Sequence, residues 1–192
     1  VKGVMKRVLD ISEQAFLDKM AKLPDGTWQD RTYVECCKPG DRKTYRVVLT
    51  AHKEDTQITF ENEGTAPQEG AMNATFSGWR GSVIVALNQL LCWDQNFAVG
   101  GALRHVTFDP TPGTLNCARH PASVSTAPTQ SMEISLYPAY NVLGKMIYAS
   151  PEMLRGRYNE KTDIWSLAIP AAPHVSGFRI GLYVLSFLLF IG

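Results

Sequence analysis

The chain has 192 residues, 45% of them hydrophobic and 19% charged, so it can bury a core and is too apolar to be disordered throughout. Its net charge is +1, and the Lys and Arg residues are scattered along the sequence. Proteins that bind nucleic acid gather these cations on one face, so the composition argues against a nucleic-acid partner.

The cysteines also narrow the function classes. Cys36 and Cys37 are adjacent, and neither Cys92 nor Cys117 forms a C-x-x-C pair with another cysteine, so we do not expect a zinc site. We expect reduced thiols, with Cys92 on a buried helix face. The N-terminus lacks the apolar run of a signal peptide, and Val at position 1 indicates a fragment. A cytoplasmic location without a membrane partner is therefore expected.

The first predicted helix follows Ser12, whose hydroxyl suits an N-cap. Four apolar residues recur after it at helical spacing: Phe16, Leu17, Met20 and Leu23. The Pro-Asp-Gly sequence at residues 24–26 then ends the helix and turns the chain.

Three strands are expected next. Residues 27–35 are rich in Trp, Thr, Tyr and Val, which favour strands. After a solvated turn at residues 38–43, residues 45–50 alternate in a way that predicts one more deeply buried face. Residues 58–60 repeat the alternation after a turn at residues 52–55, which predicts an antiparallel hairpin.

A Gly-rich loop at residues 62–70 separates the strands from a long helix. A connecting loop is the simpler interpretation, although backbone N–H groups ahead of a helix can also hold an anion. No Lys follows Gly70, so the loop is not a nucleotide-binding P-loop. The helix is predicted over residues 79–93, where Trp79, Val83 and Leu87 share one apolar face.

Three further elements complete this part of the chain. We expect a short strand at residues 103–108, an extended segment at residues 114–117 and a helix at residues 131–148. Pro138 has no N–H to donate, so it predicts a kink or two shorter helices. The predicted fold class is α+β, with antiparallel hairpin strands and long buried helices, as a fragment of a larger mixed α/β subunit.

Residues 23–147 resemble the hydantoinase B/oxoprolinase family. Four motifs in the expected order carry the resemblance: Leu-Pro-Asp-Gly at 23–26, the segment Ile-Thr-Phe-Glu-Asn-Glu-Gly-Thr-Ala-Pro-Gln at 58–68, Gly-Gly-Ala-Leu-Arg at 100–104 with Pro-Gly-Thr-Leu-Asn at 112–116, and Pro-Ala-Ser-Val-Ser at 121–125. Each motif is short, but their shared order and spacing make the match specific.

The resemblance implies one subunit of an ATP-dependent enzyme. Residues 63–73 look closer to the acetone and acetophenone carboxylase branch, so the implied reaction is ketone carboxylation or hydrolysis of a hydantoin or 5-oxoproline type of cyclic amide. A hydantoinase A-type partner subunit would bind ATP and Mg, and Mn or another divalent metal would bind outside this window. The isolated chain is expected to be inactive.

The resemblance leaves the catalytic residues unknown. Asn73, Arg104 and Arg119 are candidates for substrate binding, because an amide or a guanidinium can hold a carboxylate or phosphate. For the two arginines, surface ion pairing is the favoured alternative. His105 with Asp109, or His120, have side chains that can bind a metal, although a loop histidine held by a backbone hydrogen bond is favoured.

The sequence changes character after Met146. Residues 148–167 are similar to the activation segment of NIMA-related protein kinases, but the nucleotide loop and the His-Arg-Asp and Asp-Phe-Gly motifs are missing, which excludes kinase activity. The tail at residues 168–192 fits neither family, and its apolar run at 180–191 is shorter than the roughly 20 residues that a spanning helix needs. A buried terminal helix, a truncated membrane segment and translated non-coding sequence are the alternatives, and the last is favoured.

These resemblances predict three parts: a hydantoinase B/oxoprolinase-like partial domain at 1–147, a kinase-like remnant at 148–167 and an unassigned tail at 168–192. A composite gene model would explain their combination. A non-catalytic interaction module, with the apolar helices as its docking surface, is the alternative from another functional class.

Overall fold

The computed structural model describes residues 1–35, 37–95, 99–125 and 129–149. The chain divides into two units, Val1–Leu154 and Arg155–Gly192, and all described residues belong to the first. Almost all of the kinase-like segment and all of the apolar tail therefore lie outside the described residues. In the part described, no helix is long and apolar enough to cross a membrane.

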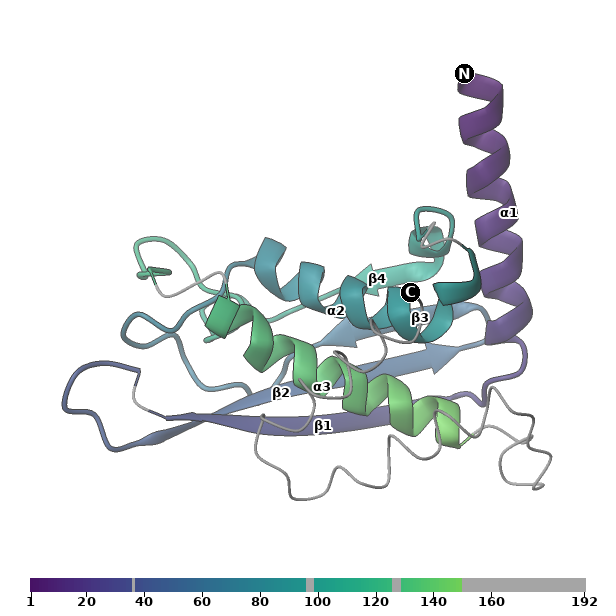
Figure 1. The fold of residues 1–192 in the computed structure, drawn as a ribbon. Helices are drawn as coiled ribbons and strands as arrows, with labels where there is room; N and C mark the ends of the chain where they lie inside the picture. The colour runs from purple at the N-terminus through teal and green to yellow at the C-terminus, as the bar shows by residue number, and fades with distance from the viewer. Residues whose placement is uncertain (36, 96–98, 126–128, 150–192) are drawn as a thin grey trace, which may run out of the picture. The chain divides into compact units, whose positions relative to one another are not determined.

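Four strands form one sheet in the order β1-β2-β3-β4, and the first three pair antiparallel while β3 and β4 run parallel. Two long helices, α2 and α3, pack against one another and cover one face of the sheet (Figure 1). The elements in chain order are α1 (Lys2–Met20), β1 (Gly26–Glu35), β2 (Thr44–Glu54), β3 (Gln57–Glu61), α2 (Phe76–Leu91), the 3₁₀ helices η1 (Trp93–Gln95) and η2 (Ala102–His105), β4 (Val106–Phe108) and α3 (Thr129–Tyr148). The predicted α+β class is confirmed.

The core lies between the sheet and the two helices. Leu49 on β2 and Phe60 on β3 point to the helices and are almost fully buried. Trp79 and Leu87 on α2 meet them, as their helical spacing predicted. Each such side chain contributes about 1.5–3 kcal/mol on burial, so this contact is the main source of stability.

The first helix begins earlier than predicted. It starts at Lys2, and Ser12 lies inside it instead of capping it. The Ser12 hydroxyl donates a hydrogen bond to the Leu9 carbonyl oxygen (3.0 Å) and accepts one from the Gly101 N–H (3.0 Å). A serine can remain in a helix interior when its hydroxyl bonds to the preceding turn, and here it also holds a distant loop. The helix also ends earlier than predicted, at Met20, so Leu23 lies outside it and residues 24–26 are not its stop.

Two predicted strand boundaries were also wrong. β2 continues to Glu54, so the hairpin turn contains Asp55 and Thr56 and not residues 52–55; Asp55 takes a positive φ of 49° to make this tight turn. Residues 102–105 form η2, and the strand begins only at Val106. Alternating apolar residues gave no signal for the shorter turn or the 3₁₀ helix.

The segment at residues 114–117 and the last helix also differ from their predictions. Thr114 and Cys117 form isolated bridges between turns, where an extended segment was predicted. α3 is one helix with Pro138 inside it, so of the two predicted alternatives the two shorter helices are wrong and a kink stays a prediction. A proline removes a single helical hydrogen bond, and buried residues on the following turns, Val142, Leu143 and Met146, keep the helix against the core.

The Gly-Gly pair at residues 100–101 is explained by contact with α1. A Cβ atom on Gly101 would lie 2.2 Å from both the Leu9 carbonyl oxygen and the Ser12 Oγ. One on Gly100 would lie 2.7 Å from the Leu9 Cδ2. Only glycine therefore allows this loop to approach the helix so closely.

We predict that Gly101→Ala destabilises the chain by about 1–3 kcal/mol, because the added methyl group would meet backbone atoms of α1 that cannot move aside. The matched control is Gly81→Ala in α2, where a Cβ meets nothing within 4 Å. That change should stabilise the chain by about 0.5–1 kcal/mol, the helical preference for alanine. Urea unfolding of both variants measures the difference, and equal effects would contradict the close contact.

Candidate functional site

Two loops meet beyond the carboxyl ends of β3 and β4: the first covers residues 62–75 and the second residues 109–125. They contain three of the family-like segments, namely most of 58–68, and all of 112–116 and 121–125. The Pro67 backbone bridges to Thr114, and the Leu115 N–H donates to the Ala66 carbonyl oxygen (3.0 Å). The first loop also runs along β2, where the Ala66 N–H donates to the Arg46 carbonyl oxygen (2.8 Å). The Gly-rich segment is therefore a fixed backbone layer between β2 and the second loop.

Asn62 is the buried polar centre of this loop pair. Its Nδ2 donates to the Thr114 Oγ1 (2.9 Å) and to the Asn116 Oδ1 (2.6 Å), while its Oδ1 accepts from the Thr111 N–H (2.6 Å). Both amide hydrogens are therefore used inside the protein. Because a buried amide must be paired, this set fixes the relative position of the two loops.

Asn73, a predicted substrate-binding residue, also links the two loops through its side-chain amide. Its side chain is almost fully buried, and its Oδ1 accepts from the Glu69 N–H (2.9 Å). Its Nδ2 donates to the carbonyl oxygens of Gly70 (3.1 Å) and Ser123 (2.8 Å). With both amide hydrogens satisfied, Asn73 joins the ends of the two loops in this structure, and substrate binding by it stays a prediction.

Arg119 lies in the second loop, four residues before Ser123, whose carbonyl oxygen accepts a hydrogen bond from Asn73. Its backbone N–H donates to the Gln68 Oε1 (2.8 Å). Its side chain is exposed and makes no hydrogen bond or ion pair within the described residues, and neighbouring His120 is also exposed. Of the three predicted substrate-binding residues, Arg119 is the one whose polar side-chain atoms are free to meet a ligand.

A hollow of about 240 Å³ lies on the sheet face opposite α2 and α3. Seven residues from β1, β2, β3 and the first loop line it: Gln29, Arg31, Arg46, Val48, Glu61, Glu63 and Gly64. The Arg46 Nε donates to the Gly64 carbonyl oxygen (2.9 Å), and the Glu61 carboxylate pairs with His52 (3.1 Å). Two guanidinium groups and two carboxylates thus border one small space, which suits a small ligand with charges of both signs.

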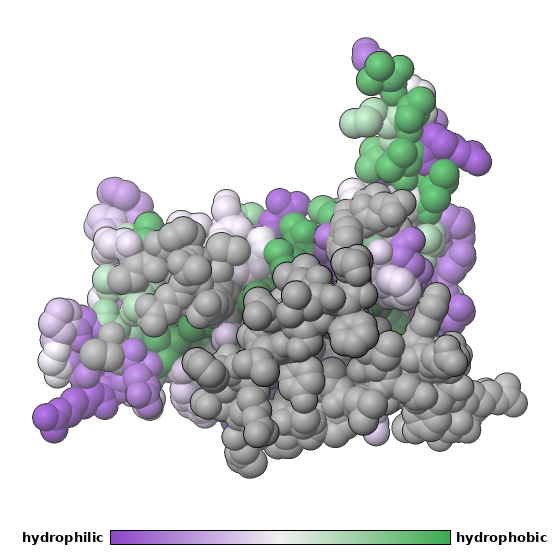
Figure 2. Space-filling view, viewed as in Figure 1, coloured by the Kyte–Doolittle hydropathy of each residue, from purple (hydrophilic) through white to green (hydrophobic). Residues whose placement is uncertain are grey.

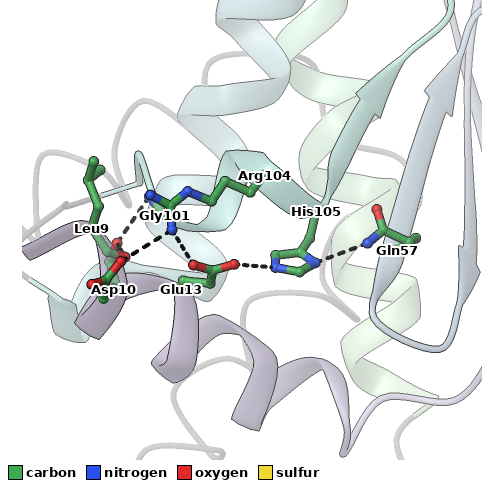
Figure 3. Close-up of polar contacts among 8 residues, drawn as sticks. Leu9, Asp10, Glu13, Gln57, Gly101, Arg104 and His105 are labelled. Carbon is green, nitrogen blue, oxygen red and sulfur yellow. Dashed lines mark hydrogen bonds and ion pairs between the residues drawn. The ribbon is translucent and has the colours of Figure 1, made fainter. Parts of the chain in front are cut away.

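The predicted residues Arg104 and His105 lie in a different place, where η2 meets α1 (Figure 3). The Arg104 guanidinium forms an ion pair with Glu13 and a longer one with Asp10 (3.4 Å). The His105 Nε2 lies 2.9 Å from the Glu13 Oε1, and its Nδ1 lies 3.0 Å from the Gln57 Nε2. Arg104 thus forms a surface ion pair, as the favoured alternative predicted. His105 forms hydrogen bonds with two side chains, whereas a hydrogen bond to the backbone was predicted.

Glu13 is the shared partner in this α1–η2 contact. The hydrogen bond from His105, and after it that from Arg104, lowers the pKa of the Glu13 carboxyl from its ordinary value. Since both ring nitrogens of His105 have partners, the ring must leave this network before it can bind a metal. The bonds of Glu13 to Arg104 and His105 therefore attach α1 to η2.

The structure also separates the predicted metal ligands. His105 precedes β4 and Asp109 follows it, which places them about 13 Å apart along the strand. One metal ion with ligand distances near 2 Å cannot reach both side chains. Among the described residues, no group of three or more His, Cys, Asp or Glu side chains is placed to hold a metal ion.

We predict that part of the pH dependence of stability comes from Glu13. Because folding lowers the pKa of its carboxyl, the stabilisation is present above the unfolded-state pKa and is lost as the pH falls through the folded-state pKa. Urea unfolding between about pH 7 and pH 3, the range that covers carboxyl titration, should show a smaller loss of stability in Glu13→Gln than in the parent chain. Exposed Glu35→Gln is the control, and identical pH slopes for parent and Glu13→Gln would refute the assignment.

The hydantoinase B/oxoprolinase family model matches residues 1–162, which confirms the resemblance found in residues 23–147. Among solved structures, the ATP-dependent caprolactamase from Pseudomonas jessenii is similar, with a TM-score of 0.64 and 18% identity. The match covers 80% of this chain and 26% of that one, and at this identity it shows the fold alone. Comparison with curated proteins gives no match.

The acetone carboxylase branch and the kinase-like segment stay predictions, although the family match itself continues fifteen residues past position 147. The match includes every loop and helix described above, from α1 through α3. Because it spans well over half of the sequence, the chain belongs to the hydantoinase B/oxoprolinase family.

Proposed function

We propose that this chain is part of a subunit of an ATP-dependent enzyme that hydrolyses a cyclic amide. The observation that carries the proposal is the family match over residues 1–162. The fold similarity to a protein described as an ATP-dependent caprolactamase supports this reaction class, since caprolactam is a cyclic amide. Ring opening of such an amide gives a product with one amino and one carboxylate group.

In this proposal the catalytic work is divided between chains. A hydantoinase A-type partner would bind ATP and Mg and phosphorylate the amide oxygen, and water would then attack the activated carbon. The described residues supply a fixed loop pair, the free guanidinium of Arg119 and the charged hollow. They supply no metal-binding cluster, so Mn or another divalent ion would be bound by other residues of the assembly.

Ketone carboxylation is the second candidate, favoured by the wording of residues 63–73. Both reactions use ATP to activate a carbonyl compound. They differ in whether water then attacks the carbonyl carbon and breaks the C–N bond, or the neighbouring carbon loses a proton and bonds to the carbon supplied by bicarbonate. A substrate assay can therefore distinguish them. The third candidate, a non-catalytic interaction module, predicts no turnover with either substrate.

The test is expression of the chain with and without a hydantoinase A-type subunit. The purified chain alone should open neither caprolactam nor 5-oxoproline, because in this proposal the partner subunit binds the ATP. The joint preparation should open one of these rings only when ATP and Mg are present, as measured by chromatography of the amino acid product. Turnover by the chain alone would overturn the divided mechanism, and carboxylation of acetone with bicarbonate would favour the second candidate.

Within such an active assembly, we predict that Arg119→Gln lowers kcat/KM about tenfold or more. A hydrogen bond to a charged group contributes about 1.5–3 kcal/mol, and the free guanidinium of Arg119 is available to make one. Arg42→Gln, at another exposed arginine in the turn before β2, is the matched control and should leave kcat/KM unchanged. Equal kcat/KM values for both variants would remove Arg119 from the site.

A further inference from the structure

The hollow on the sheet face opposite α2 and α3 contains two charged side chains that the described residues leave unpaired. Arg31 on β1 and Glu63 in the first loop are exposed, and neither side chain forms a hydrogen bond or ion pair within the part of the chain that the structure describes. The Arg46 and Glu61 side chains beside them already have partners. Among the described residues, the hollow therefore offers a ligand one free guanidinium and one free carboxylate.

The hollow exists because β3 is shorter than β2. β3 pairs with residues 50–54 of β2 and then ends. Beside Val48 the Thr65 hydroxyl takes the place of a strand, since it accepts a hydrogen bond from the Val48 N–H (2.9 Å) and donates one to the Val48 carbonyl oxygen (3.3 Å). The chain ahead of Thr65 thus leaves the sheet, and Glu63 and Gly64 line one side of the hollow.

Val48 separates the two free charges. It is the one apolar side chain among the seven described residues that line the hollow. Arg31 lies opposite it on β1, and Glu63 lies on the other side of β2. The two charged residues are therefore about two strand spacings apart at the backbone, or roughly 10 Å. The hollow has an apolar centre with opposite charges at its two ends.

This charge pattern disfavours ions of a single sign. The two carboxylates that border the hollow would repel a phosphate, and the two guanidinium groups would repel a metal cation or a simple amine. The volume of about 240 Å³ also limits the occupant to a small molecule, because pockets for drug-sized ligands hold roughly 300–1,000 Å³. A small molecule that carries both charges and is neutral overall suits the hollow best.

We propose that the hollow binds a short, unbranched amino acid whose carboxylate and ammonium groups lie at opposite ends. The carboxylate would accept two hydrogen bonds from the Arg31 guanidinium, and the ammonium group would pair with Glu63. The methylene groups between them would lie over Val48. An α-amino acid has both charges on one carbon and cannot reach both residues.

The charge pattern of the hollow is independent of the proposed function. Only the choice of 6-aminohexanoate as the probe rests on that function, since ring opening of a lactam gives an acid of this kind. Binding is measured without ATP and without a partner subunit. Failure to bind would therefore overturn the site and leave the turnover test of the joint preparation unaffected.

The test is isothermal titration calorimetry of the full chain with four probes. 6-Aminohexanoate should bind. Hexanoate and hexylamine should each bind about tenfold or more weakly, because each lacks one of the two charged contacts. Glycine should also bind at least about tenfold more weakly, because it can make only one of those contacts at a time.

Variants of the two charged residues locate the binding. Arg31→Gln and Glu63→Gln should each weaken binding of 6-aminohexanoate about tenfold or more. Arg31→Glu combined with Glu63→Arg should restore binding to near the parent value, because the ligand can then bind in the reverse direction. A purely structural role would give no such rescue.

Arg42→Gln and Glu35→Gln are the matched controls, since both residues are exposed and lie outside the hollow. Arg42 belongs to the turn between β1 and β2, which is the hydrophilic projection at the lower left of Figure 2. Both controls should leave the affinity unchanged. No binding of 6-aminohexanoate, equal binding of hexanoate or hexylamine, or equal affinity of the parent chain and the two single variants would overturn the proposal.

Discussion

The hydrogen bonds of Asn62 are the constraint on which the loop arrangement depends. One buried amide joins the end of β3 to three residues of the loop that follows β4, at distances of 2.6 to 2.9 Å. Because β3 and β4 run parallel, both loops leave the sheet at the same edge, and a polar link there fixes them together. Asn73 makes a second link between the two loops, through hydrogen bonds to the carbonyl oxygens of Gly70 and Ser123. The family-like segments at residues 62–68, 112–116 and 121–125 thus form one connected pair of loops.

The opposite end of the parallel pair is organised around α1. Arg104 and His105 reach Glu13, and the backbone of Gly101 lies against the same helix. Arg104 and Arg119, which were both predicted to bind substrate, therefore lie beyond opposite ends of β4. The Arg119 side chain in the loop pair is exposed, whereas the α1 contact uses its charged groups internally.

Regular elements were predictable because their burial repeats along the sequence. The alternation of β2 and the four-residue spacing of Trp79, Val83 and Leu87 indicated one strand and one helix correctly. The start of α1 was missed although Val4, Val8 and Ile11 recur at helical spacing, because Ser12 was interpreted as the cap at which the helix begins. Ser12 then resembled a cap although its hydroxyl is used inside the helix.

The sites were less predictable, since they depend on strand register and on partners far away in the sequence. Arg31 borders the hollow because β1 pairs with β2 so that Arg31 lies opposite Val48, and the sequence alone does not give that pairing. His105 likewise meets Glu13 across 92 positions. Local patterns named Arg104 and His105 as candidates but could not show that their partners occupy them.

The long separation between α1 and its glycine partner has a consequence during protein synthesis. The Ser12–Gly101 bond joins residues 89 positions apart. At a translation rate of about 5–20 residues per second, Ser12 is synthesised roughly 4–18 seconds before Gly101. During that interval the helix lacks the glycine loop against which Leu9 and Ser12 pack, so its attachment to the domain is completed only after β3 and α2 have been made.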